Sequence, residues 1–265
     1  ENIRAADSDG DLLVQACSND SQVCVHAIRN LNRIAMGTAK MRWSQTGYGR
    51  TSSTSVAQET PRNLFGFKDG TNNIKSEDGD AKLNEHLWVQ KGDDSGADWM
   101  AGGTYFVVRK IHMFAEMWDN LRLIEQEQTF GRDKRYGAPL NVTAPTSGKD
   151  EFKPIDFKAK NKEGELEVPA DSHIAIVNPE QNKGRWMLRR GYNYTEGSDA
   201  LGRLSAGLFF IAFVRDPRTN FYPILDKMTQ KDALSEYLQH QARALFAIPA
   251  GIGQSDTMVG QALFS

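Results

Sequence analysis

Of the five histidines in the chain, His173 has the surroundings best suited to a metal ligand. It follows a long polar stretch and begins a short apolar segment that Asn178 and Pro179 close. No second histidine or cysteine lies at the spacing of a zinc site. A single neutral imidazole suits a metal whose other positions are already filled, as those of haem iron are. The local pattern alone leaves a structural histidine open as the alternative.

The other four histidines have ordinary surroundings. His26 and His240 fall within helical patterns, and His86 and His112 lie near the ends of expected elements. Each is expected to be a surface residue or a core residue with its hydrogen bonds satisfied.

Two further segments carry side chains that could act on a bound ligand. GFKDGTNN places Asp69 between Gly66 and Gly70. Such a segment is either a simple turn or a loop whose glycines let the backbone approach a flat ligand while the carboxylate points into its pocket. MLRRGYNY pairs Arg189 with Arg190 among aromatic residues. These arginines are either a solvated pair or include one turned inward as a fixed cation.

The first part of the chain has the pattern of a strand, a helix and a strand. Residues 11–17 indicate a buried strand, residues 20–36 a helix capped by Asp20 or Ser21, and residues 39–45 a second strand. The Gly-, Ser- and Thr-rich segment 46–63 is typical of a linker.

The remainder begins near residue 61 and contains two strand–helix units. The apolar run 102–112 predicts a strand, followed by a helix over 113–130. Residues 131–170 are polar and without periodicity, as in a long functional loop. A second strand is expected over 206–214 and a helix over 230–246. Together these elements suggest a ferredoxin-like α+β sandwich with a large insertion.

Composition excludes several classes of protein. A net charge of −2 gives no basic excess for binding nucleic acid or an anionic membrane. No apolar run approaches the ~20 residues of a membrane span, and the polar residues 1–10 do not form an export signal. Cys17 and Cys24 are expected to be buried free thiols, with a disulfide as the weaker alternative.

Four motifs in register resemble the dye-decolourising (DyP-type) haem peroxidases, specifically the bacterial branch that contains the exported deferrochelatase/peroxidases. They are GFKDGTNN at 66–73, DSHIAIVNP at 171–179, MLRRGYNY at 187–194 and GRLSAGLFFIAF at 202–213. The resemblance implies an α+β fold of two related ferredoxin-like halves, each an antiparallel sheet packed with helices. The first half would be incomplete over residues 1–60, and residues 61–265 would form the second half, which carries the haem site.

The resemblance also implies a role for particular residues around haem b. His173 matches the proximal ligand of the iron, Asp69 the distal acid–base residue and Arg189 the distal arginine. Other positions match residues that line the haem. Asn73 matches a distal polar residue, and Leu208 and Phe210 match apolar walls above the iron. The residues whose backbone would line the haem are Gly70, Thr71, Asn72, Asn178, Pro179 and Glu180. Trp186, Tyr192 and Tyr194 are candidate electron relays to bulky donors, although ordinary packing explains them better.

These residue types suit peroxide chemistry. A carboxylate can take a proton from the inner oxygen of hydrogen peroxide and return it to the outer one, and a guanidinium stabilises the charge on the departing oxygen. The implied function is oxidation of an organic donor by hydrogen peroxide. The alternatives are a deferrochelatase, which removes iron from haem as a substrate, and a non-catalytic haem carrier in iron uptake.

Two departures from the family pattern bear on this expectation. Relatives carry an acidic residue just before the AGLFF-like strand as acceptor for the proximal histidine; here that position is Ser205, and a neutral acceptor would make the ligand less electron-donating. The chain also starts inside the first half, which would leave a strand edge exposed. By resemblance the protein is expected to be exported to the periplasm or the outer side of the membrane and to form a homodimer.

Overall fold

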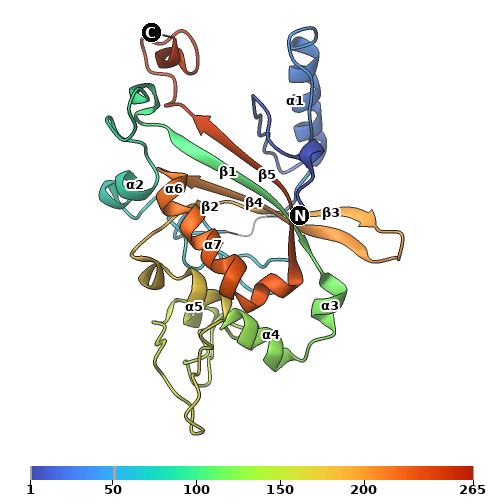
Figure 1. Cartoon of the computed structure of the whole chain (residues 1–265), viewed down its shortest axis with the longest axis vertical. Coiled ribbons are helices and arrows are strands. Elements are labelled where there is room, and N and C mark those ends of the chain that lie inside the picture. Colours follow the sequence, from blue (N-terminus) through green and yellow to red (C-terminus); the bar gives the residue numbers. More distant parts are fainter. Residues whose placement is uncertain (1, 50–51, 265) are drawn as a thin grey trace.

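The computed structural model describes residues 2–49 and 52–264 and is built around one antiparallel sheet of five strands (Figure 1). The strands are β1 (Thr104–Met113), β2 (Leu188–Arg189), β3 (Tyr192–Ser198), β4 (Leu204–Val214) and β5 (Leu238–Ile248). Their order is β2-β4-β1-β5, and β3 also pairs with β4. The predicted strands over 102–112 and 206–214 are therefore confirmed as β1 and β4, which run side by side in the middle of the sheet.

Seven α-helices accompany the sheet in the described chain. They are α1 (Ser21–Ile34), α2 (Asp80–His86), α3 (Ala115–Asp119), α4 (Leu123–Phe130), α5 (His173–Val177), α6 (Pro217–Asn220) and α7 (Tyr222–Lys231). Short 3-10 turns occur at Ala5–Asp7, Asp98–Met100, Gly148–Phe152, Pro179–Asn182, Ala233–Tyr237 and Gln261–Leu263. None of the helices within the described ranges is long and apolar enough to cross a membrane. The expected α+β class is confirmed.

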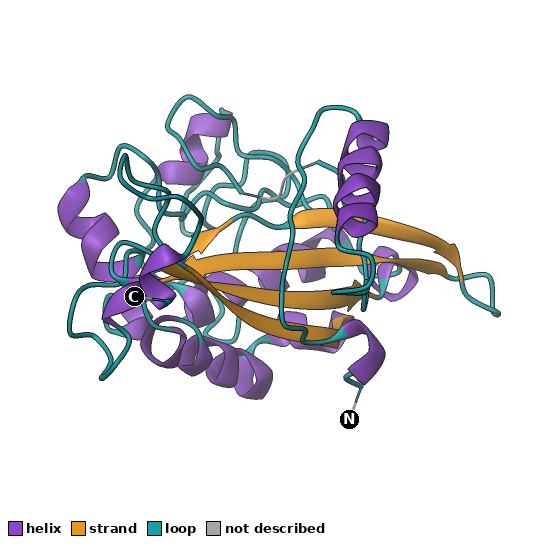
Figure 2. Ribbon diagram, turned by 90° about the horizontal axis from the view of Figure 1, so that it is seen from above, coloured by secondary structure: helices purple, strands orange, loops and turns teal. Residues whose placement is uncertain are grey.

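The two faces of the sheet pack against different parts of the chain. One face buries Val107, Ala212 and Val214 against Phe221, which begins the α7 region. The opposite face buries Phe106 and other side chains against residues from the first part of the chain, including Leu13 and Trp43. Figure 2 shows the strands running as one twisted layer between these parts. The first face, together with α5 and α7, encloses the candidate site.

The first 60 residues differ from expectation. Helix α1 forms as predicted, and the side chain of Asp20 caps it by accepting from the backbone N–H of Gln22. Segments 11–17 and 39–45, however, are not strands in the structure. A strand exists only where a second strand satisfies its N–H and C=O groups, and the described chain offers these segments no such partner.

No residue of α1 is buried, and Figure 1 shows the helix projecting away from the sheet. The two cysteines beside it are free thiols, as expected, but Cys17 is exposed and Cys24 half-buried rather than both being buried. The division at residue 60 into two halves stays a prediction.

Two helix predictions in the second part were wrong. The helix expected over 113–130 is interrupted between α3 and α4. The side chain of Gln126 donates to the carbonyl of Trp118 and so stabilises the turn between the two helices. The helix expected over 230–246 is mostly strand β5. Its alanines favour a helix locally, but Ala242 and Ala244 alternate with exposed residues, and pairing along β1 decides the outcome.

The segment 46–63 is not the loose linker that its composition predicts. Arg50 and Thr51 lie outside the described residues, but Ser52 and Ser53 directly after them are almost fully buried. Their backbone passes beside Gly70, where a Cβ atom would lie only 2.4 Å from the Cα of Ser52. Gly70 has φ +112° as well, so both the close approach and the backbone conformation require glycine. The crossing of these two chain segments therefore requires a glycine at position 70.

Candidate active site

The candidate site is a large, mainly apolar cavity between the first face of the sheet and helices α5 and α7. It encloses about 1480 Å³ when the part open to solvent is included. Its walls include ten of the residues singled out from the sequence, namely Asp69, Gly70, Thr71, Asn72, His173, Asn178, Pro179, Arg189, Leu208 and Phe210. The fold therefore brings together residues from four separate motifs.

His173 is the first residue of α5 and is held in place by the turns around it. Gly131 ends α4 in the left-handed conformation, and a Cβ atom there would lie 2.6 Å from Ile174. The missing side chain thus lets α5 pack closely against the end of α4. The ring of Phe130 meets the His173 ring edge-on at 6.0 Å.

The Nδ1 atom of His173 is 2.7 Å from Oδ2 of Asp232, whose side chain is completely buried. The other oxygen of Asp232 accepts from the backbone N–H of Leu234, so the carboxylate is fixed in orientation. A carboxylate only accepts hydrogen bonds, so the ring carries its proton on Nδ1 and Nε2 is left as the free ligand atom. Burial lowers the pKa of His173, but the charge of Asp232 and its hydrogen bond outweigh burial and raise the pKa overall.

The sequence predicted a neutral acceptor, Ser205, for the N–H of His173, and the structure shows a different residue in that role. Ser205 lies on β4 and is not among the residues that line the cavity. The acidic acceptor for His173 is Asp232, which follows α7 in the chain. Nothing in the local sequence of either residue indicates the pairing, because 59 positions separate them. The ligand histidine therefore has a charged acceptor, not a neutral one.

Asp69 and Arg189 form an ion pair at the cavity wall, with Arg189 Nη1 2.5 Å from Asp69 Oδ1. The side chains are 17% and 24% exposed, respectively, so both reach the cavity from partly buried positions. Arg190 turns outward and donates to the hydroxyl of Tyr192. Of the two interpretations of this pair, one arginine turned inward is the one the structure supports.

The loop that carries Asp69 rests on aromatic residues. Phe65 stacks on Trp118 with ring centres 4.4 Å apart, and Phe67 stacks on Phe130 at 4.1 Å. The backbone N–H of Asp69 donates to the carbonyl of Pro61. A buried aromatic cluster on one side and a backbone hydrogen bond on the other thus determine where the carboxylate lies.

Two of the residues assigned by resemblance lie outside the cavity lining. Asn73 is almost fully buried; its Oδ1 accepts from the backbone N–H of Arg189, and its Nδ2 donates to the carbonyls of Arg189 and Ser53. It holds the backbone of Arg189 instead of facing a ligand. Glu180 is exposed, and its backbone N–H donates to the side chain of Asn178.

The candidate electron relays have unfavourable surroundings. The ammonium of Lys82 lies 3.6 Å from the centre of the Trp186 ring, and a cation there disfavours loss of an electron from the indole. Tyr194 is buried, its hydroxyl has no hydrogen-bond partner in the described chain, and burial raises its pKa. The hydroxyl of Tyr192 accepts from Arg190. Packing remains the better explanation for all three.

Among the polar residues of the cavity wall that were not singled out as site residues are Arg109 and His240. Arg109 lies on strand β1 directly after the apolar run 105–108, where a charged residue is itself a signal that the sequence offered. His240, expected on a helix, lies on β5 next to Ile111 of β1 and faces the same cavity. Neither the Nε of Arg109 nor the Nδ1 of His240 has a hydrogen-bond partner in the described residues.

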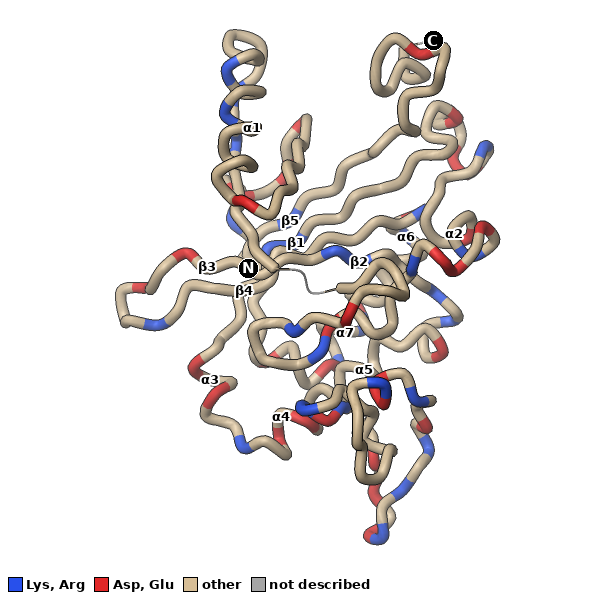
Figure 3. The backbone as a smooth tube through the Cα atoms, turned by 180° about the vertical axis from the view of Figure 1, so that it is seen from behind, with Lys and Arg blue, Asp and Glu red and all other residues tan. Residues whose placement is uncertain are grey.

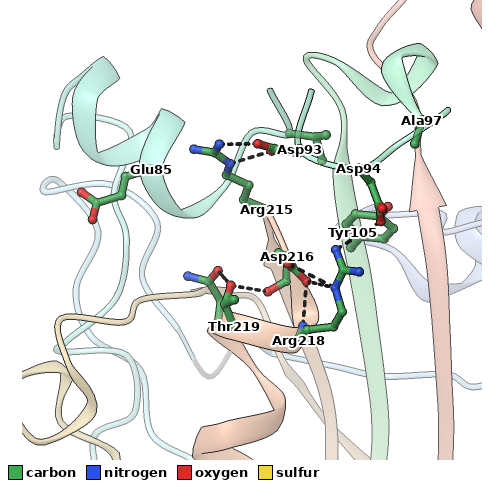
Figure 4. A pocket seen from close by; sticks show the side chains of 11 residues that line it. Glu85, Asp93, Asp94, Ala97, Tyr105, Arg215, Asp216, Arg218 and Thr219 are labelled. Carbon is green, nitrogen blue, oxygen red and sulfur yellow. Dashed lines mark hydrogen bonds and ion pairs between the residues drawn. The ribbon is translucent and has the colours of Figure 1, made fainter. Parts of the chain in front are cut away.

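A second cavity, of about 660 Å³, lies near α2 and α6 (Figure 4). Its charged side chains pair with one another: Arg215 binds both oxygens of Asp93, and Arg218 binds Asp94 and Asp216. Arg218 is 63% exposed, so water screens its pairs. Figure 3 likewise shows acidic and basic residues interspersed along the chain. This cavity is not a candidate active site.

Comparison with known proteins shows the family of the chain. The family model "Dyp-type peroxidase, C-terminal" matches residues 60–253, and "Dyp-type peroxidase, N-terminal" matches residues 1–49. A dye-decolorizing peroxidase of Thermobifida fusca is 35% identical over 243 residues, which cover 91% of this chain and 55% of that protein. A deferrochelatase of Escherichia coli is 34% identical over 266 residues, covering 99% and 60%. The chain therefore spans less than two thirds of these relatives.

Solved structures give the same result. Ferric DtpA from Streptomyces lividans superposes with a TM-score of 0.89 at 37% identity, covering 99% of this chain and 68% of that one. A DyP-type peroxidase from Cellulomonas bogoriensis gives 0.85 at 32% identity, covering 99% and 69%. The family to which these proteins belong is haem-dependent. From the two family models, the relatives and the shared fold, the chain belongs to the Dyp-type peroxidase family.

Proposed function

We propose that the protein is a haem peroxidase that reduces hydrogen peroxide while oxidising an organic donor such as a dye, with haem b as its cofactor. The proposal rests on two hydrogen-bonded pairs at one cavity. His173 pairs with Asp232, and Asp69 pairs with Arg189. A carrier of haem needs neither an acid–base carboxylate nor a fixed cation. Their presence favours catalysis over transport.

The cavity has the charge that a haem requires. Haem carries two propionate groups, so its site must supply positive charge. Only Asp69 contributes a carboxylate to the described lining, whereas five residues contribute a permanent cation: Lys68, Arg109, Arg132, Arg185 and Arg189. The remaining walls are largely apolar, and the Nε2 atom of His173 would hold the iron. The residues present fit the group.

Each polar residue then has a defined task. Bound haem supplies an iron that coordinates peroxide and provides the electrons for cleaving its O–O bond. His173 would hold the iron, and the charged hydrogen bond to Asp232 keeps the imidazole electron-rich.

Asp69 moves the proton. Its Oδ1 is engaged by Arg189, and its Oδ2 has no hydrogen-bond partner in the described residues. Oδ2 is therefore the atom that accepts the proton from the inner oxygen of peroxide and returns it to the outer oxygen. Arg189 orients the carboxylate, and the rest of its guanidinium stabilises the negative charge on the departing oxygen.

Two substitutions test the assignment. Asp69→Asn and Arg189→Leu should leave haem bound, but slow the reaction with peroxide by about 10²-fold or more, the usual effect of losing an acid–base group or a charge-stabilising donor. The measurement is the rate of the Soret absorbance change after mixing with peroxide. Arg190→Leu is the matched control, since Arg190 faces Tyr192 outside the site. Unchanged rates in both site variants would contradict the proposal.

A second function is favoured by the relatives named deferrochelatase. Removal of iron from haem would leave an intact porphyrin, which fluoresces once the iron is gone. Incubation of the haem-loaded protein without peroxide, followed by porphyrin fluorescence and iron analysis, separates the two activities. Free porphyrin without consumption of a donor would replace the peroxidase by the chelatase.

A further inference from the structure

Arg109 is the cation of the cavity wall whose Nε is buried without a hydrogen-bond partner in the described residues. Among the other cations of the cavity wall, Arg189 pairs with Asp69, Lys68 pairs with Glu151 at 2.7 Å, and Arg132 donates to two backbone carbonyls. Arg185 also lacks a side-chain hydrogen bond, but none of its nitrogens is sealed from solvent. The Nε of Arg109 is sealed and has no acceptor.

The guanidinium of Arg109 lies 5.6 Å from the centre of the Phe221 ring. Burial accordingly lowers the pKa of Arg109, but a guanidinium does not lose its proton in a protein. A buried, permanently charged group is costly unless an opposite charge accompanies it. Among the described residues, the carboxylate of Asp9 acts on Arg109 electrostatically, but no carboxylate forms an ion pair with the guanidinium, which leaves its donors available to a carboxylate of a ligand.

His240 lies beside Arg109 on the cavity wall. It is opposite Ile111 on β1, two residues from Arg109 on the same face of the sheet. Burial and the nearby charge of Arg109 lower the pKa of His240 to about 4, so the ring is neutral near pH 7. Its Nδ1 is buried without a partner. A cation and a neutral hydrogen-bonding group thus face one point of the cavity.

We propose that Arg109 and His240 form a receptor for one carboxylate of the porphyrin, a propionate of the haem that the proposed function requires. The guanidinium offers paired N–H donors in the geometry that a carboxylate accepts, and the imidazole offers a further N–H. A propionate there would neutralise Arg109 and satisfy both buried nitrogens. The pair would thereby fix how the porphyrin is turned within the cavity.

The test compares haemin with haemin dimethyl ester, in which both carboxylates are blocked. The intact apoprotein is titrated with each, and dissociation constants are obtained from Soret absorbance. Wild type should prefer haemin. Arg109→Met should weaken haemin binding at least about tenfold, the loss expected for a hydrogen bond to a charged group, and leave ester binding unchanged. His240→Leu should weaken haemin binding several-fold and the ester not at all.

Arg243→Met is the matched control, since Arg243 is exposed on β5 directly opposite Arg109 and does not line the cavity. It should leave both constants unchanged. The melting temperature of the apoproteins separates ligand binding from a structural role. Removing a buried charge that forms no ion pair should leave Arg109→Met as stable as wild type or more so, whereas a structural arginine would destabilise the apoprotein when replaced.

The outcomes are distinct for the two proposals. If wild type binds haemin and the ester equally, or if Arg109→Met loses both to the same extent, the carboxylate receptor is wrong and the haem peroxidase stands. If wild type binds neither, the proposed function fails and the receptor fails with it.

Discussion

Replacing Asp232 by asparagine should change the acid–base behaviour of His173. Asparagine keeps the shape of the side chain and an oxygen acceptor, but removes the buried negative charge 2.7 Å from Nδ1. Hydrogen bonds to charged groups contribute about 1.5–3 kcal/mol, and 1.36 kcal/mol corresponds to one pKa unit. The pKa of His173 in the apoprotein should therefore fall, because the charge of Asp232 would no longer outweigh the lowering effect of burial.

The assay is NMR titration of the imidazole resonances in haem-free protein. Ser205→Ala is the control, since Ser205 occupies the position at which the family pattern places the acidic acceptor. It should leave the pKa of His173 unchanged. If the pKa of His173 fell in Ser205→Ala and did not change in Asp232→Asn, the argument that Asp232 raises this pKa would be refuted.

The same substitution has a consequence for stability against pH. Because the pKa of His173 is raised in the folded apoprotein, the protonated ring stabilises the fold fully below its unfolded value of about 6.5. That contribution is lost as the pH rises through the folded pKa. Wild type should therefore exceed Asp232→Asn in unfolding free energy by more in mildly acidic solution than in alkaline solution. Urea titrations of both proteins at each pH measure this difference.

Two further predictions concern the loop that carries Asp69. Gly70→Ala should lower the unfolding free energy, measured by denaturant titration, by more than about 2 kcal/mol, because it adds a clash with Ser52 to an unfavourable φ. Gly79 also has a positive φ (+85°), but a Cβ there would meet open space, so Gly79→Ala should lower the unfolding free energy by only about 1 kcal/mol. Asn73→Ala should cost about 1–3 kcal/mol and slow the reaction with peroxide while haem stays bound, because the backbone of Arg189 loses both of its bonds to Asn73. Asn73→Asp, which keeps the acceptor, should retain more of the rate; equal losses in both variants would contradict this role.

The parts of the fold that the sequence predicts well are those where apolar periodicity is strong. Strands β1 and β4 contain long apolar runs, and α1 has a capping residue at its start. Strand β5 was missed because its alanines favour a helix, and its pairing with β1 depends on residues about 130 positions away. Local propensity does not report such partners.

The site shows the same limit. His173, Asp69 and Arg189 were identified from their motifs, because each motif is contiguous. Asp232 and His240 were not, since their relevance comes from where the turn after α7 and strand β5 lie in space. Arg109 offered a missed signal, since it is a charged residue directly after the apolar run 105–108 of β1.

The strand order has a bearing on how the protein is made. β1, in the middle of the sheet, pairs with β4 and β5, which follow it by about a hundred residues or more. During synthesis, the nascent chain that has just completed β1 carries a strand with both edges open, and such non-local pairing forms slowly. His173 emerges from the ribosome well before Asp232 and His240. Binding of haem in the proposed arrangement therefore has to follow translation of β5, and until then the chain carries the open edges of β1, which are prone to aggregation.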